Sequence, residues 1–268
     1  MLKPETIASA ANPLLKDVRR AIARSGLTSQ GWCVAETLHL LDEALRSRCR
    51  VKQVLAAESA RDRLPRLAGI RLAILPDALL QRVSGTEASQ GVIALVEPPE
   101  WKLPELFQAP ALVVVLDGLQ DPGNAGAIVR AAEAFGATGA IFLKGTASPF
   151  NPKTLRASAG SLFRVPFLYG MDPALARAAF EEHRVTLYAA VPSRPGVPVS
   201  DVADADLTAA CAFIVGNEGR GVNREWSGAA PRVCVPISIP TMAVESLNAA
   251  MAAGILLYEA RRQRSRRV

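Results

Sequence analysis

The chain has 268 residues, half of them apolar, so it is long enough to bury two compact cores and too apolar to be a disordered protein. No wholly apolar run, "ALVVVL" at 111–116 included, is long enough to cross a bilayer, and the start of the chain lacks the apolar core of a signal peptide; together these features predict a cytoplasmic protein. The net charge of +6 favours a polyanionic partner, but most of it comes from the five arginines of 261–267, which either contact phosphates or form a solvated helix end.

The first hundred residues alternate helical and strand-like patterns. Segments 11–26 and 36–48 have helical periodicity, and the second places Leu38, Leu41 and Leu45 on one face. Short aliphatic runs between and after these helices predict strands. We therefore expect a small α/β domain at residues 1–96, followed by a proline-rich linker at 97–110.

Beyond the linker, bare aliphatic runs alternate with helical patterns. Strands that are apolar on both faces and alternate with helices predict a parallel sheet covered on both sides, which we assign to residues 111–268. The runs lie at 111–116, 139–143, 185–191, 211–216 and 232–237.

The cysteines and histidines indicate no familiar metal or nucleophilic site. Four isolated cysteines without a C-x-x-C pair make structural zinc and a disulfide framework improbable. His39 and His183 lie outside any glycine- or serine-rich motif, so we interpret both as ordinary residues and expect no metal.

The first loop of interest follows the strand that ends near Leu116. Asn124 is a good N-cap for a helix over 125–135, and Gly136 suits its exit. Arg130 falls opposite the apolar stripe of that helix, so it is either solvated or functional. "GLQDPGNAG" contains no G-x-G-x-x-G, which disfavours a nicotinamide-dependent enzyme.

The second loop, "FIVGNEGRGV" at 213–222, carries three glycines and a single acid after an apolar strand. Gly216, Gly219 and Gly221 predict positive φ angles and a close approach of backbone to a ligand, with Glu218 as the one anionic side chain there.

The third loop precedes the last helix. Ser246 is a candidate N-cap that would place Asn248 in the first helical turn, where two short polar groups can hold a ligand hydroxyl. The small residues within 249–254 suit close approach to another backbone, which we expect within a dimer.

"NAGAIVRAAEAFGA", "FIVGNEGRGV" and "ESLNAAMAAGILLYEA" resemble, in order and spacing, the three signature motifs of the SpoU/TrmH family of RNA 2'-O-ribose methyltransferases, members of the SPOUT superfamily. Residues 1–96 resemble the family's substrate-binding domain, which is similar to a small ribosomal RNA-binding protein. There the usual glycine after the glutamate is replaced by Thr37.

The resemblance implies an α/β protein whose C-terminal parallel-sheet domain has a deep trefoil knot. It further implies S-adenosylmethionine as cofactor, an obligate homodimer and RNA as partner. By position it implies a catalytic set of Asn124, Arg130, Glu218, Ser246 and Asn248. It also implies a cofactor-binding set of Gly216, Asn217, Glu218, Leu247 and Asn248, together with Ile237 or Ile239, because "VPISIPTM" offers two candidates.

The function implied is methyl transfer to a ribose 2'-hydroxyl, most naturally of ribosomal RNA. Transfer RNA is the alternative substrate, and a non-catalytic RNA-binding protein is the alternative class. A guanidinium stays protonated in proteins, so Arg130 would need an RNA phosphate to relay the proton, or would stabilise the developing alkoxide instead.

Overall fold

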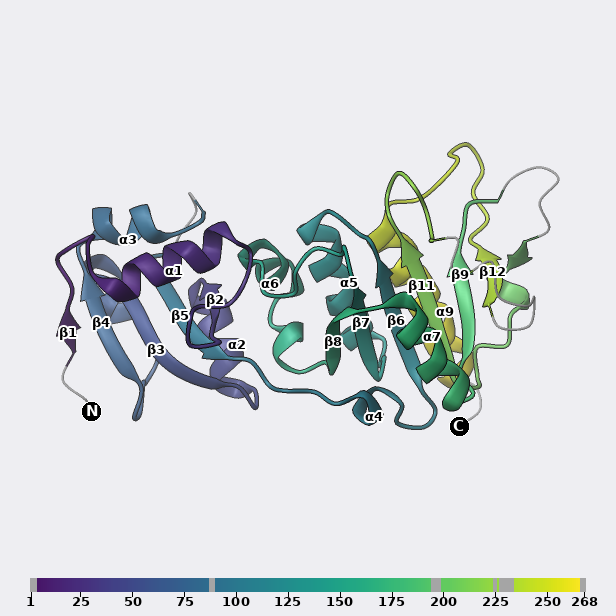
Figure 1. Cartoon of the computed structure of the whole chain (residues 1–268), viewed down its shortest axis with the longest axis horizontal. Helices are drawn as coiled ribbons and strands as arrows, with labels where there is room; N and C mark the ends of the chain where they lie inside the picture. The colour runs from purple at the N-terminus through teal and green to yellow at the C-terminus, as the bar shows by residue number, and fades with distance from the viewer. Residues whose placement is uncertain (1–3, 87–89, 194–198, 224–225, 227–233, 266–268) are drawn as a thin grey trace. The chain divides into compact units, whose positions relative to one another are not determined.

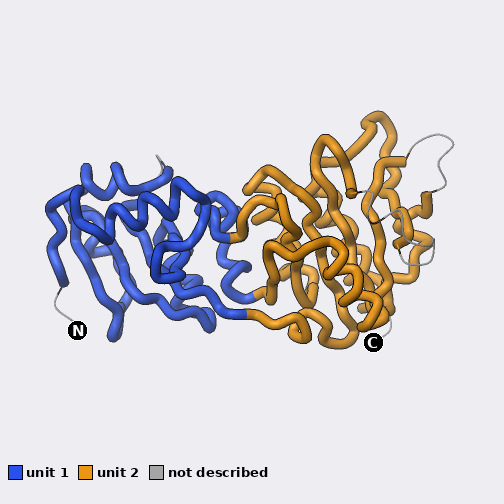
Figure 2. The backbone as a smooth tube through the Cα atoms, viewed as in Figure 1, with its two compact units in different colours: residues 1–100, 150–164 blue, residues 101–149, 165–268 orange. Residues whose placement is uncertain are grey.

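The structure is a computed structural model that describes residues 4–86, 90–193, 199–223, 226 and 234–265. It divides into two compact units, the first formed by residues 1–100 and 150–164 and the second by 101–149 and 165–268 (Figure 2). The boundary at residue 100 lies inside the predicted linker. Residues 150–164 follow the second unit's strand β7 (Gly139–Leu143) in the chain but pack with the first unit.

The first unit contains a five-stranded sheet in the order β1-β4-β3-β5-β2 (Figure 1). β1, β3 and β4 are parallel, and β5 is antiparallel to both β3 and β2. Its strands are β1 (Glu5–Thr6), β2 (Cys33–Glu36), β3 (Arg50–Ala57), β4 (Arg71–Leu75) and β5 (Val92–Glu97). Its helices are α1 (Pro13–Ala23), α2 (Leu38–Arg46), η1 (Glu58–Arg63), α3 (Asp77–Val83), α6 (Pro152–Ser158) and η2 (Ser161–Phe163).

Helix α2 differs from its predicted orientation. Leu40, Leu41 and Ala44 are its fully buried residues, whereas Leu38 and Leu45 of the predicted stripe are only partly buried. Thr37 caps this helix, because its side chain accepts a hydrogen bond from the amide of Leu40 at 3.2 Å. Thr37 has a φ of 125°, a backbone conformation suited to glycine.

The second unit contains a seven-stranded sheet in the order β10-β12-β9-β11-β6-β7-β8, which is parallel as predicted, although β8 and β10 lie outside the predicted runs. Its further strands are β6 (Leu112–Asp117), β8 (Phe167–Met171), β9 (Thr186–Ala190), β10 (Ser200–Asp201), β11 (Cys211–Gly216) and β12 (Cys234–Ser238). Its helices are α4 (Leu103–Leu106), α5 (Pro122–Ala134), α7 (Pro173–Glu182), η3 (Val202–Asp204) and α9 (Ala249–Ser265).

Helices cover both faces of this sheet. One buried cluster joins Leu106 of α4 and Phe180 of α7 to alternate residues of the central strands, such as Val113 and Ile214. The intervening residues of those strands point to the opposite face, where α5 and α9 pack against β6 and β11. Burial on both faces explains why these strands are aliphatic along their whole length.

The arginine tail begins inside α9, and Arg264 has a structural role in it. The Arg264 guanidinium donates to the carbonyl oxygens of Leu207, Pro110, Ala111 and Ala209 at 2.7–2.9 Å. Arg264 is therefore neither a solvated helix end nor available to phosphates, the two readings that the sequence left open.

Arg262 is paired with Glu259, while Arg261 is exposed. Arg266 and Arg267 lie outside the described residues. In the part of the chain that the structure describes, no helix is both long and apolar enough to span a bilayer.

Candidate active site

The first predicted loop leads from β6 into α5, and the cap of α5 is not the predicted one. The side chain of Asp121 accepts from the amide of Asn124 at 2.8 Å, so Asp121 is the N-cap and Pro122 occupies the first helical position, which suits proline. The helix therefore begins three residues earlier than predicted, and Asn124 lies in its first turn with its side chain free for other contacts. Gly136 leaves the helix with a φ of 76°, as predicted.

The second predicted loop folds back on the end of β11. The backbones of Asn217 and Gly221 bond each other in both directions, at 3.0 and 2.9 Å. The side chain of Asn217 accepts from the amides of Gly219 and Arg220, at 3.0 Å each. The loop is thus a tight turn closed by Asn217.

The three glycines of this turn do not lack a side chain for the same reason. Only Gly221 has the predicted positive φ, at 72°. A Cβ on Gly216 would lie 2.2 Å from the carbonyl carbon of Gly221, so Gly216 is required by the returning chain itself. The nearest atom to a Cβ on Gly219 would be 3.7 Å away, so the described protein has room for a side chain at this position.

Asp117, at the end of β6, binds the backbone of the same segment. This residue was not among those selected from the sequence. It is 6% exposed, and its carboxylate accepts from the amide of Asn223 at 2.7 Å. The carbonyl of the next residue, Gly118, accepts from the side chain of Asn217 at 2.9 Å. An acid that ends a wholly aliphatic strand was the available signal, since a buried carboxylate needs hydrogen-bond donors.

Glu218, Asn124 and Asn248 form one chain of hydrogen bonds. Asn124 Nδ2 donates to Glu218 Oε1 at 3.1 Å, and Asn248 Nδ2 donates to Asn124 Oδ1 at 3.0 Å. A carboxylate can only accept, so Glu218 fixes the Asn124 amide with its nitrogen toward the acid and its oxygen toward Asn248. The two motif residues predicted at separate helix starts are thereby joined.

Glu218 also accepts from the backbone amides of Gln120 and Asp121, at 3.3 and 3.5 Å. Partial burial alone would raise the pKa of the Glu218 carboxyl, but the hydrogen bonds from backbone amides and Asn124 outweigh it and hold this pKa below the ordinary value. Glu218 is therefore an anion bound at the start of α5, and not the freely presented acid that the sequence suggested.

The third predicted loop ends at α9, which Asn248 caps. Asn248 Oδ1 accepts from the amides of Ala250 and Met251 at 2.9 and 3.3 Å, whereas Ser246 is exposed and caps no helix. The predicted cap was two residues too early. Ala253 of the small-residue face is fully buried in this chain, and α9 packs against α5.

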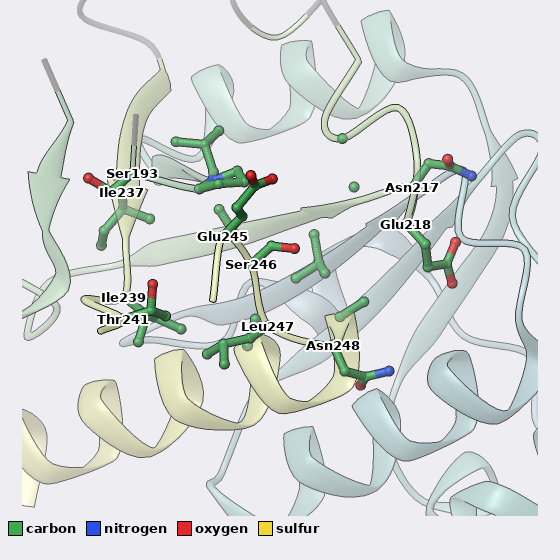
Figure 3. Close-up of a pocket in the computed structure, with 18 of the residues that line it drawn as sticks. Ser193, Asn217, Glu218, Ile237, Ile239, Thr241, Glu245, Ser246, Leu247 and Asn248 are labelled. Carbon is green, nitrogen blue, oxygen red and sulfur yellow. The ribbon is translucent and has the colours of Figure 1, made fainter. Parts of the chain in front are cut away.

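A pocket of about 970 Å³ opens at the carboxyl ends of β9, β11 and β12 (Figure 3). Both isoleucines that the sequence offered, Ile237 and Ile239, line it. The other predicted cofactor-binding residues do so as well: Gly216, Asn217, Glu218, Leu247 and Asn248. Polar residues that the sequence reasoning did not select also line it, namely Ser193, Thr241 and Glu245.

Of the predicted catalytic residues, Ser246 lines the pocket, while Asn124 and Arg130 do not. Arg130 is exposed on α5 and has no hydrogen bond or ion pair to any described residue. Its charge is therefore available to a ligand outside the pocket.

The histidines and cysteines give no competing site. His183 stacks on Phe107 at 4.2 Å, and His39 is exposed. The four cysteines are free, and burial raises the pKa of both Cys211 and Cys234 to about 11, which keeps these two as unreactive thiols at neutral pH. Within the described residues no cluster of His, Cys, Asp and Glu is arranged to hold a metal ion.

Comparison with known proteins identifies two family regions. Residues 111–258 match the SpoU rRNA Methylase family, and residues 38–102 match the RNA 2'-O ribose methyltransferase substrate binding family. One relative is the 23S rRNA (guanosine(2553)-2'-O)-methyltransferase RlmP of Bacillus subtilis, 32% identical over 95% of this chain and 98% of its own length. Another is the 23S rRNA (uridine(2479)-2'-O)-methyltransferase of Streptomyces viridochromogenes, 34% identical over 76% of this chain and 71% of its own.

Solved structures agree over both units. The SpoU methyltransferase AviRb of Streptomyces viridochromogenes, crystallised with AdoMet, superposes with a TM-score of 0.79 at 27% identity, covering 95% of this chain and all of its own. An AdoMet-bound rRNA methyltransferase of Sinorhizobium meliloti has the same TM-score at 26% identity, over 96% of this chain and 97% of its own.

Proposed function

Because the chain belongs to the SpoU rRNA methylase family, we propose that it transfers a methyl group from S-adenosylmethionine to a ribose 2'-hydroxyl of 23S ribosomal RNA. The two relatives named above modify a guanosine and a uridine. The ribose is what their substrates share, so the proposal is made for the sugar and not for one base. The observation that carries it is the pocket itself, which gathers residues of the second and third motifs together with residues that follow β9 and residues of and after β12.

The pocket fits S-adenosylmethionine in size and chemistry. Its volume is at the upper end of the usual range for small-molecule sites. Val215, Ile237 and Leu247 offer apolar walls for a base, and the backbone of 216–221 offers amide and carbonyl groups for polar atoms. When bound, S-adenosylmethionine supplies an electrophilic methyl group on its sulfonium sulfur.

The protein's own residues supply positioning. Asn217 and Asp117 fix the 217–223 segment that walls the pocket, and Glu218 fixes Asn124 against Asn248, which lines the pocket. Holding the ribose hydroxyl in line with the methyl group accounts for much of the acceleration of such a displacement. Arg130, exposed and without a partner among the described residues, stabilises the developing alkoxide or directs its proton to an RNA phosphate.

The same proposal includes a homodimer. Met251, Ile255 and Tyr258 are 60%, 38% and 54% exposed and follow one another at helical spacing on α9. A second copy packed on this apolar stripe would cover it. Ile255→Glu should then lower the mass measured by sedimentation and reduce methyl transfer, whereas an unchanged mass in that variant, or a wild-type monomer, would refute the dimer. The trefoil knot and the cytoplasmic location stay predictions.

The direct test is incubation of the purified protein with deproteinised 23S ribosomal RNA and S-adenosylmethionine labelled in the methyl group. We expect label in a 2'-O-methylnucleoside after nuclease digestion, at a position mapped by arrested reverse transcription. Label on a base, or transfer only to transfer RNA, would contradict the proposal. Tight S-adenosylmethionine binding without transfer to any RNA would favour a non-catalytic protein.

A further inference from the structure

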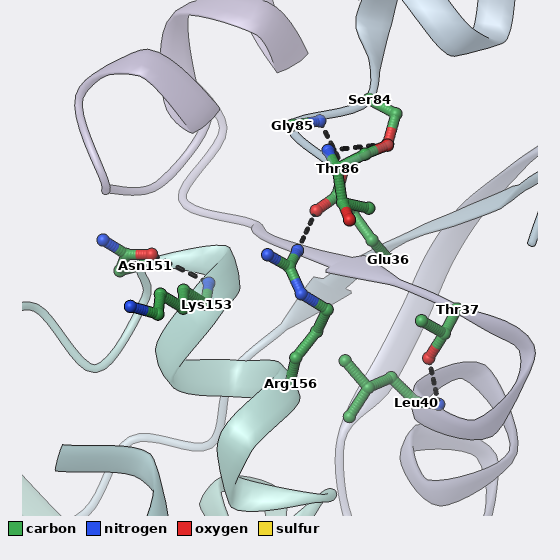
Figure 4. A network of polar contacts seen from close by, with 9 residues as sticks. All are labelled: Glu36, Thr37, Leu40, Ser84, Gly85, Thr86, Asn151, Lys153 and Arg156. Carbon is green, nitrogen blue, oxygen red and sulfur yellow. Dashed lines mark hydrogen bonds and ion pairs between the residues drawn. The ribbon is translucent and has the colours of Figure 1, made fainter. Parts of the chain in front are cut away.

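Three helix ends of the first unit are joined around the buried side chain of Glu36. This carboxylate is fully buried, and it accepts from Ser84 Oγ at 2.7 Å and from the Gly85 amide at 2.6 Å, just after α3. Its other oxygen pairs with the Arg156 guanidinium of α6 (Figure 4). The acid therefore ties the C-terminal end of α3 to α6.

The C-terminal end of α1 meets the same place. Asn151 Nδ2, at the start of α6, donates to Ser25 Oγ at 2.9 Å, directly after α1. A Cβ on Gly85 would lie 2.7 Å from Ile22 Cγ2, so the segment after α3 rests against the last turn of α1. The ends of α1 and α3 and the start of α6 thus form one surface.

Exposed cations occupy these helix ends. Arg19 lies on the exposed side of α1 and Arg24 is the C-cap of that helix, while Arg82 lies in the last turn of α3 and Lys153 in the first turn of α6. Arg19, Arg24 and Arg82 make no side-chain hydrogen bond or ion pair to any described residue. We call Arg19, Arg24, Arg82 and Lys153 the basic helix-end surface.

Among the described residues, the acids of α1 and β2 are paired with groups other than Arg19, Arg24 and Arg82. Asp17, the one acid of α1, accepts from the amide and hydroxyl of Ser29 and lies 3.5 Å from Arg20. Glu36 is buried and already paired with Arg156. Three guanidinium groups therefore have no partner among the described residues, and planar guanidinium forks match the geometry of phosphate oxygens.

The positive charge of the basic helix-end surface would suit either RNA or an anionic membrane. Which side of α1 is buried distinguishes these two ligands. A helix that lies in a membrane interface must expose an apolar face. On α1 that face consists of Leu15, Val18 and Ala21, which are buried in the core of the unit. Only the charged side is open, which fits a polyanion in water.

We propose that the basic helix-end surface binds the phosphate backbone of the substrate RNA. The inference rests on the proposed function, which supplies an RNA substrate, and it names the part of the first unit that holds it. α6 contributes to this surface although it lies in the chain between two strands of the methyltransferase sheet.

The test is the triple variant Arg19→Gln, Arg24→Gln, Arg82→Gln. Glutamine has a helix propensity close to that of arginine, and all three sites are exposed, so the fold should persist. Filter binding to deproteinised 23S ribosomal RNA, measured across a salt series, should show affinity about tenfold or more weaker. The slope of log affinity against log salt should become shallower by about 2 to 3, as expected for three lost phosphate contacts.

The matched control is Arg46→Gln, Arg48→Gln, Arg71→Gln. These arginines are also exposed, and the strand register places Arg48 and Arg71 near the end of the sheet opposite to Glu36. The control should bind RNA as the wild type does. An equal loss in both triples, or an unchanged salt slope in the first, would overturn the inference, as would wild-type binding to phosphatidylserine vesicles that disappears in the first triple while RNA binding persists.

A failure of the proposed function would give a different result from a failure of this inference. It would appear as wild-type protein that transfers no methyl group to RNA, whatever the triples do. The inference predicts that the first triple keeps wild-type affinity for S-adenosylmethionine in calorimetric titration, and keeps methyl transfer at saturating RNA within about threefold, because uniform substrate binding affects KM and not kcat.

Discussion

Asn248 donates a side-chain hydrogen bond to Asn124 across 124 positions of sequence, joining the start of α9 to the first turn of α5 at 3.0 Å. Asn124 in turn donates to Glu218, so one acid orients two amides. Asn248→Ala should remove both this bond and the cap of α9. We expect a loss of about 1 kcal/mol in the free energy of unfolding from the missing cap.

The same Asn248→Ala variant should lose methyl transfer by more than that stability change explains. Ser246→Ala is the control, because Ser246 also lines the pocket but caps no helix, and its unfolding free energy should stay within about 0.5 kcal/mol of the wild type. Chemical denaturation and labelled-methyl assays measure the two effects. Equal stability of the two variants would contradict the cap assignment.

The lowered pKa of Glu218 makes a prediction about pH. A carboxyl whose pKa is lower in the folded state contributes stability that is fully present above its unfolded pKa, here about 4.5, and is lost as the pH falls through the folded pKa. The difference in unfolding free energy between the wild type and Glu218→Gln should therefore be constant from about pH 8 to 6 and shrink below about pH 4.5.

Glu245→Gln is the matched control, because Glu245 lines the same pocket but makes no hydrogen bond to any described residue. The difference in unfolding free energy between Glu245→Gln and the wild type should not shrink in this way on acidification. A Glu218→Gln difference that grows on acidification would mean that the carboxyl is not stabilised as an anion.

Arg130→Ala should reduce methyl transfer by roughly a hundredfold or more, the usual scale for losing a proton-transfer or charge-stabilising group. Arg130 is exposed and has no described protein partner, so the unfolding free energy should change by less than about 0.5 kcal/mol and cofactor affinity should persist. Single-turnover kinetics with saturating RNA separates the chemical step from binding. Near-wild-type turnover would remove Arg130 from the active site.

Gly216→Ala should abolish cofactor binding and destabilise the protein, because the added Cβ would lie 2.2 Å from the backbone of Gly221. The expected loss is in the range of about 1 to 3 kcal/mol that overpacking causes. Gly219→Ala is the control in the same turn, since its Cβ meets nothing closer than 3.7 Å. Calorimetric titration with S-adenosylmethionine distinguishes them, and equal affinity in both variants would show that the 216–221 turn does not hold the cofactor.

Arg264→Ala should lower the unfolding free energy by about 2 to 4 kcal/mol, because several carbonyl oxygens lose a charged donor. Arg261→Ala, on the exposed side of the same helix turn, should change it by less than about 0.5 kcal/mol. Thermal and denaturant unfolding measure both. A silent Arg264→Ala would return this residue to the role of a solvated helix end.

The sequence by itself determined the two α/β units and the parallel character of the second sheet, because strands buried on both faces must be aliphatic throughout. It also indicated part of the pocket lining, since glycines and short polar side chains at the carboxyl ends of strands can be recognised locally, but it missed Ser193, Thr241 and Glu245. The N-cap at Asp121 could also have been predicted, because Pro122 follows it and proline favours the first helical position. Asn124 was predicted instead, because asparagine is also a residue type that favours N-caps.

Only the tertiary structure decided which partner each polar group takes. The reason is that a hydrogen bond depends on where a distant segment returns: Asp117 meets Asn223, Arg264 meets the carbonyls before β6 and β11, and Asn248 meets Asn124. Likewise the requirement for Gly216 comes from the approach of Gly221 and not from its own φ. The placement of 150–164 in the first unit, through the Glu36 and Arg156 pair, is a long-range contact of the same kind, for which local periodicity carries no signal.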